Sequence, residues 1–81
     1  MTKREYLESI GYRKSTETIY YKYTEDEDYC EKIIDLKYKN APYAFRLNVL
    51  VGINSLEDID AIKLELEDLK NDFKEMKKYG D

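Results

Sequence analysis

One apolar stripe in the last third of the chain restricts its possible folds more than any other feature. Apolar side chains recur three or four residues apart, at Ile59, Ile62, Leu66, Leu69, Phe73 and Met76. This spacing predicts an amphipathic helix that starts at a capping Ser55, runs to about Tyr79 and ends at Gly80. We expect the stripe to pack on a core, because fewer than four heptads are present for the alternative, a coiled-coil partner. Leu56 and Leu64 lie off the stripe and are candidates for contact with a second chain.

The middle of the chain supplies the surface that this helix would cover. Segments 17–24, 29–39 and 43–51 alternate β-branched or aromatic residues with other types, as strands do. A turn at 40–42 and a run of acids separate these segments, and such short connections favour an antiparallel meander. Near the start, Thr2 and Glu5 have the spacing of a capping box, which predicts a short helix over about residues 3–10.

We therefore predict an α+β fold, with a three-stranded antiparallel sheet and both helices packed on one face (αβββα). The chain has 81 residues, so we expect one domain that spans residues 1–81. The alternation of the strands and the spacing of the helices give the expected core: Leu7, Ile10, Ile19, Tyr21, Ile34, Leu36, Phe45, Leu47, Val49, Ile59, Ile62, Leu66, Leu69 and Phe73.

The other face of the sheet has no expected cover. We predict that it carries Tyr20, Lys22, Tyr29, Ile33, Arg46 and Leu50. Tyrosine and arginine are the residue types that anchor protein interfaces, so this face is a candidate binding surface for another protein. The alternative is an ordinary solvated face with ion pairs between neighbouring strands.

Four consecutive acids, Glu25, Asp26, Glu27 and Asp28, follow the first predicted strand. They either dock onto a basic partner or form only the solvated tip of a hairpin. Their spacing differs from that of a calcium-binding loop, so we predict no calcium site. The net charge of −4 argues against direct binding of nucleic acid and is compatible with a partner protein that has a basic surface.

Familiar catalytic arrangements are missing from the sequence. There is no histidine, which excludes Ser–His and Cys–His pairs and histidine metal ligands. The three glycines stand apart and form no phosphate-binding loop. We expect Cys30, at an inward strand position, to be a small core residue rather than a nucleophile. The chain is therefore predicted to have no enzymatic activity, no cofactor and no metal.

The expected location follows from three further observations. A single cysteine cannot form an internal disulfide. No apolar run is long enough to span a membrane, and the first residues lack the apolar stretch of a signal peptide. We expect a cytoplasmic protein that makes no contact with membranes.

A short first helix, a sheet carrying YYKYTEDEDY and a terminal helix on a small acidic chain resemble phage-encoded accessory proteins of the anti-CRISPR kind. The resemblance implies a non-enzymatic inhibitor in the host cytoplasm. Such an inhibitor uses carboxylates to occupy the DNA-binding surface of a CRISPR nuclease. The function we expect is therefore protein binding. The alternative is a self-assembling structural component, a homodimer formed through the open sheet face or the last helix.

Overall fold

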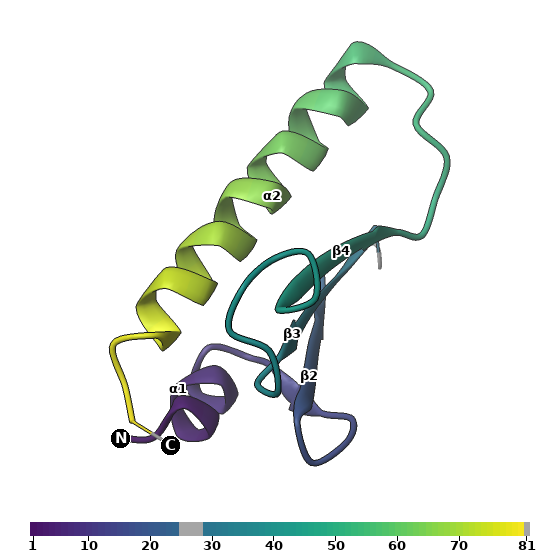
Figure 1. Cartoon of the computed structure of the whole chain (residues 1–81). Helices are drawn as coiled ribbons and strands as arrows, with labels where there is room; N and C mark the ends of the chain where they lie inside the picture. Colours follow the sequence, from purple (N-terminus) through teal and green to yellow (C-terminus); the bar gives the residue numbers. More distant parts are fainter. Residues whose placement is uncertain (25–28, 81) are drawn as a thin grey trace.

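The computed structural model describes residues 1–24 and 29–80. Along the chain its elements are α1 (Lys3–Ser9), β1 (Arg13–Lys14), β2 (Ile19–Tyr23), β3 (Cys30–Asp35), β4 (Phe45–Val49) and α2 (Leu56–Met76) (Figure 1). The predicted α+β fold, with a short first helix and a long last one, is confirmed. The strands are shorter than predicted, most of all β3, which ends at Asp35 instead of continuing to residue 39.

The sheet has one more strand than predicted. Within the described residues it contains four antiparallel strands in the order β1-β2-β3-β4. The added strand, β1, pairs with β2 at two positions, Arg13 with Tyr21 and Lys14 with Tyr20. Two exposed basic residues carry no apolar alternation, so the pattern that reveals longer strands is absent here.

Both helices lie on the same side of the sheet, and the two ends of the described chain meet there (Figure 1). The backbone N–H of Lys3 donates to the carbonyl of Gly80 at 2.8 Å. The rings of Tyr6 and Tyr79 stack with their centroids 5.0 Å apart. These contacts fix α1 against the segment that follows α2.

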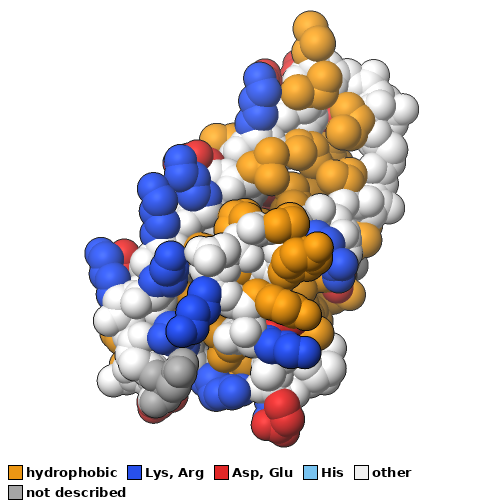
Figure 2. Space-filling model, in the orientation of Figure 1, with side chains coloured by type: hydrophobic (Ala, Val, Ile, Leu, Met, Phe, Trp, Pro, Cys, Tyr) orange, Lys and Arg blue, Asp and Glu red, His pale blue; other side chains and the backbone are white. Residues whose placement is uncertain are grey.

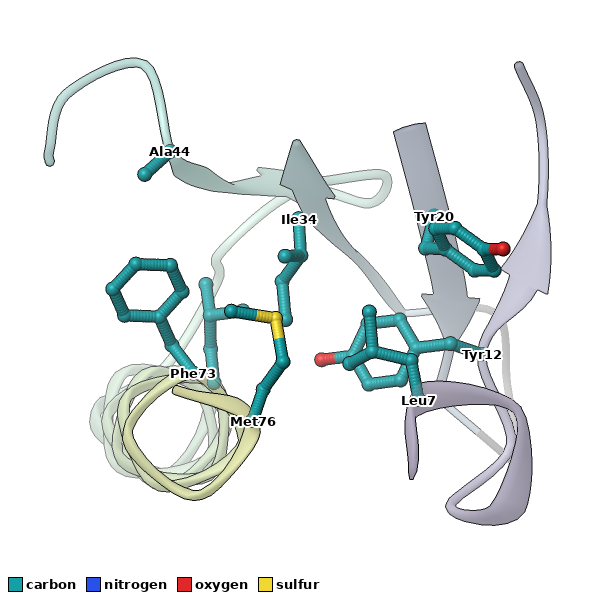
Figure 3. Close-up of a cluster of buried hydrophobic side chains, with 8 residues drawn as sticks. Leu7, Tyr12, Tyr20, Ile34, Ala44, Phe73 and Met76 are labelled. Atoms are coloured by element: carbon teal, nitrogen blue, oxygen red, sulfur yellow. The ribbon is translucent and has the colours of Figure 1, made fainter. Parts of the chain in front are cut away.

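The core lies between the sheet, α1 and the second half of α2 (Figure 3). Its buried members are Leu7, Tyr12, Tyr20, Ile34, Ala44, Leu69, Phe73 and Met76. Phe73 meets the ring of Phe45 with 4.9 Å between centroids. The hydroxyl of Tyr12 donates to Asp72 Oδ2 at 2.9 Å, so this buried polar group has a partner. Tyr12 and Ala44 lie in connecting segments and were not predicted as core residues.

The prediction of which β2 side chains point toward the helices is wrong. Tyr20 was expected on the open side but is 1% exposed within the core. Ile19 and Tyr21 were expected in the core but lie on the opposite side from Tyr20. The register explains the reversal, since Tyr20 pairs with Ile34, which is itself fully buried on the helix side.

The apolar stripe of α2 is buried along only part of its length. Leu69 and Phe73 are buried as predicted, whereas Ile59 is 40% and Leu66 is 49% exposed. Val49, at the end of β4, is also 40% exposed. These three predictions of core positions are wrong because the first half of α2 extends past the end of the sheet (Figure 1). The remaining predicted core residues, Ile10, Leu36, Phe45, Leu47 and Ile62, are partly buried.

Candidate protein-binding face

The side of the sheet away from the helices forms a continuous surface that we call the open face. Within the described chain, neither helix lies over it. Strand pairing and the alternation of side chains place nine residues on it: Arg13, Ile19, Tyr21, Tyr23, Glu31, Ile33, Asp35, Arg46 and Asn48.

The centre of the open face is a row of side chains that crosses every strand. Arg13 pairs with Tyr21, Tyr21 with Ile33, and Ile33 with Arg46. We call these four residues the central row. Its two arginines are exposed, while Tyr21 and Ile33 are half-buried. An aromatic and an aliphatic group therefore lie side by side between two guanidinium groups.

Polar and aromatic neighbours complete this surface. The rings of Tyr21 and Tyr23 meet edge to face, with centroids 5.5 Å apart. The next row pairs Tyr23 with Glu31 and Glu31 with Asn48. The amide Nδ2 of Asn48 donates to Glu31 Oε1 at 3.0 Å, which orients the carboxylate. The open face also holds a shallow depression of about 400 Å³. It is lined by Ser15, Ile19, Tyr21, Tyr23, Glu31, Ile33 and Arg46.

Chemically, the open face is suited to recognition. Tyrosine and isoleucine offer apolar surface that a partner can cover. The tyrosine hydroxyl and the arginine guanidinium offer hydrogen-bond donors. Among the described residues, no group of three or more histidine, cysteine, aspartate or glutamate side chains is placed to hold a metal ion.

The predicted binding residues do not all come together. Ile33 and Arg46 are neighbours in the central row, as expected. Tyr20 and Lys22 are on the helix side instead. The ammonium of Lys22 lies 5.5 Å from the centre of the Tyr12 ring, so this side chain packs on the core rather than facing a partner.

Tyr29 and Leu50 lie just outside the ends of β3 and β4. The backbone N–H of Leu50 donates to the Tyr29 carbonyl at 2.9 Å, and the Leu50 side chain is 47% exposed. The hydroxyl of Tyr29 is buried near Asp58, at the start of α2. Its interaction with the Asp58 carboxyl is one of the causes that lower the pKa of that carboxyl. Tyr29 thus contacts a helix, although it was predicted on the open face.

The four consecutive acids, Glu25, Asp26, Glu27 and Asp28, lie outside the described residues. The residues on either side of them are joined, because Thr24 Oγ1 accepts from the backbone N–H groups of Tyr29, at 2.6 Å, and Cys30, at 3.2 Å. These two bonds hold the end of β2 close to the start of β3.

Sequence reasoning missed Ile19, Tyr21 and Tyr23 as residues of the open face. The signal that could have found them is the register of β2 with β3. Pairing the two segments across the acidic run brings Tyr20 opposite Ile34, which the alternation of β3 places inward. Tyr20 must then be inward too, and Tyr21 outward.

Cys30 is buried, as expected. Burial and the nearby carboxylate of Glu65 both raise the pKa of its thiol, which keeps the group protonated and unreactive. Lys32, on the same inward side of β3, forms an ion pair with Glu65 of α2 at 2.5 Å.

Comparisons of the chain with protein-family models, with curated proteins and with solved structures gave no match. In the described residues, no helix combines the length and the apolar character that crossing a membrane requires. The function is therefore inferred from the geometry of this chain alone.

Proposed function

We propose that the protein is a non-enzymatic module that binds another protein through the open face of its sheet. The observation that carries this proposal is the central row, Arg13, Tyr21, Ile33 and Arg46, which crosses the sheet on the side without helices. Tyrosine and arginine dominate the energetics of protein interfaces. Large apolar side chains grouped on a surface mark interaction sites more often than ordinary solvated faces.

Protein interfaces have an apolar centre surrounded by polar residues, and the open face has the same arrangement. A partner that covers the open face would remove water from Tyr21 and Ile33, which are already half-buried. Glu31 and Asp35 flank Ile33 along β3, and their partly exposed carboxylates favour partners with complementary charge. The exposed arginines can bind carboxylates of the partner in a bidentate manner.

Protein capture with matched variants tests this proposal. The wild type, Ile33→Asp and Lys63→Glu are immobilised and exposed to lysate of the source organism and to a panel of basic nucleic-acid-binding proteins. We expect the wild type and Lys63→Glu to capture the same partner protein, and we expect Ile33→Asp not to capture it. Circular dichroism confirms that each variant is folded. Equal capture by all three chains would contradict the proposal.

A narrower proposal concerns the identity of the partner. The net charge of −4 and the four consecutive acids support a basic partner, such as a host CRISPR nuclease blocked by an inhibitor from a phage or mobile element. With such a partner purified, changing Glu25, Asp26, Glu27 and Asp28 to lysine is expected to slow association and to weaken its salt dependence. An unchanged association rate would rule out a role for these acids.

Self-association is a second candidate function, which a separate surface favours. Apolar side chains are exposed from the end of β4 into the first half of α2: Val49, Leu50, Val51, Ile53, Leu56, Ile59, Leu64 and Leu66. Figure 2 shows hydrophobic groups gathered over this end of the molecule. Leu56 and Leu64, the two residues suggested for contact with a second chain, are 80% and 68% exposed.

Light scattering on a size-exclusion column, at two protein concentrations, separates the two functions. A monomer at both concentrations favours binding of a foreign protein. A dimer that Ile33→Asp converts to monomer would place self-association on the open face. A dimer that only Leu56→Asp disrupts would place it on the helix and leave the open face for a partner.

A further inference from the structure

We propose that a pocket on the helix side of the sheet binds a small amphiphilic anion, meaning an apolar body that carries one carboxylate, sulfonate or phosphate. The pocket lies between the start of α1, the end of α2 and the connection from β3 to β4. Its volume is about 370 Å³, which is within the range of small-molecule sites. The described residues that line it are Lys3, Leu36, Tyr38, Lys39, Asn40, Phe73, Met76 and Lys77.

The base of the pocket is apolar and well supported. Phe73 and Met76 project from neighbouring turns of α2 toward the sheet (Figure 3), and they are 8% and 4% exposed. Leu36 packs against the same core. The ring of Phe45 packs against Phe73, so the base of the pocket is held in place by the core.

The rim of the pocket is basic. Lys39 and Lys77 line it from two separate segments, the connection from β3 to β4 and the residues that follow α2, and none of the described lining residues is acidic. This local positive charge contrasts with the net charge of −4 for the whole chain. The Lys77 ammonium lies 5.4 Å from the centre of the Phe73 ring, so a cation stands directly beside the apolar base.

An anion with an apolar body satisfies both parts of this site. Its apolar body would pack against Leu36 and the ring of Tyr38, which is 41% exposed, and its charge would be attracted by the ammonium groups of Lys39 and Lys77. Asn40 and Tyr38 add polar groups at the edge that can orient the anion. The pocket is on the opposite side of the sheet from the central row, so this inference does not depend on the proposed protein binding.

Two fluorescent probes with nearly the same ring system test the inference. One, 8-anilinonaphthalene-1-sulfonate, carries a sulfonate, and the other, N-phenyl-1-naphthylamine, is uncharged. Titrations are followed by fluorescence and by amide chemical shifts in NMR. We expect one saturable site for the sulfonate, with shifts around residues 36–40 and 73–77, and binding of the uncharged probe that is about tenfold weaker.

Matched variants complete the test. Lys39→Gln/Lys77→Gln is expected to weaken binding of the sulfonate about tenfold and to leave the uncharged probe unaffected. The control Lys63→Gln/Lys70→Gln removes the same charge from exposed positions of α2 and should change neither titration. The inference is overturned if both probes bind equally, if both double variants act alike, or if the sulfonate shifts amides of residues 49–66 instead.

Discussion

At the scale of single residues, Lys32 shows most clearly how tertiary contacts decide the role of a side chain. It is 5% exposed on the inward side of β3, where an unpaired ammonium would be very unfavourable. The carboxylate of Glu65, from the middle of α2, supplies its partner at 2.5 Å. The strand pattern revealed Lys32 as an interruption of an apolar face, but nothing local to β3 pointed to Glu65.

Removing only one partner of this pair should destabilise the protein strongly. We expect Lys32→Met to lower the free energy of unfolding by about 3 kcal/mol, because Glu65 is left without its cation. Lys32→Met/Glu65→Leu should recover most of the loss, since no unpaired charge then remains. Urea denaturation measures both values. A double variant as unstable as the single one would show that the pair itself, and not the unpaired charge, determines stability.

Tyr12 should give the protein a sensitivity to alkali. Burial raises the pKa of its hydroxyl well above the usual value near 10, and Asp72 raises it further. At a pH above about 10, the unfolded chain loses this proton while the folded chain keeps it. The contribution of the Tyr12 hydroxyl to the stability of the fold is therefore fully present below about pH 10 and is lost as the pH rises further.

We expect Tyr12→Phe to be less stable at neutral pH by about 1–2 kcal/mol, because Asp72 loses a hydrogen bond. Its stability should then fall less steeply above pH 10 than that of the wild type. Thermal unfolding at a series of pH values measures this slope, and Tyr43→Phe, at an exposed tyrosine, is the control. Identical slopes for Tyr12→Phe and the wild type would contradict the assignment.

At the scale of elements, both helices could be predicted, whereas the facing of one strand could not. The capping box of Thr2 and Glu5 and the cap at Ser55 are formed by neighbours in sequence, so local spacing reveals them. The β2 strand carries large apolar groups on both sides, and alternation alone cannot choose between them. Which side chains of β2 point inward depends on its pairing with β3. The open face was for this reason predicted to carry Tyr20, whereas it carries Tyr21.

The start of α2 should respond to acid through Asp58. A hydrogen bond from the Asn54 backbone N–H, at 2.9 Å, is the largest cause that lowers the pKa of this carboxyl, and Ser55 and Tyr29 add to it. A lowered pKa contributes stability above the ordinary value of 3.8, and this contribution is lost as the pH falls below it.

We expect Asp58→Asn to lower the melting temperature near neutral pH and to flatten its decrease below about pH 4. Asp60→Asn removes an exposed carboxylate from the same turn and serves as the control. Thermal unfolding monitored by circular dichroism measures both. If Asp58→Asn melts in parallel with the wild type across this range, the contact with Asn54 does not contribute to stability.

At the scale of the whole molecule, the described chain is elongated. Its extents are 40 × 21 × 17 Å, and its radius of gyration of 12.8 Å exceeds the value of about 12 Å for a compact domain of this size. The first half of α2 causes this shape (Figure 1). The helical period predicted the length of α2, but how far it extends past the sheet depends on the packing of Leu69, Phe73 and Met76.

This shape predicts uneven protection along one helix. Amides of residues 60–66 should exchange with deuterium faster than those of residues 69–76, because the first group packs on fewer buried side chains. Hydrogen exchange followed by mass spectrometry resolves the two segments. Uniform protection in the monomer would contradict the expectation, while protection that increases with protein concentration would indicate self-association through this surface.

The meeting of the two chain ends has a consequence for engineering. Thr2 and Gly80 form a bridge, and the hydrogen bond from Lys3 to Gly80 spans 2.8 Å, so a few glycine and serine residues would suffice to link them covalently. New termini could then be opened at the exposed segment 50–54, between β4 and α2. Such a circular permutant would keep the central row and the basic pocket intact, and it would release α2 from the strand that now precedes it.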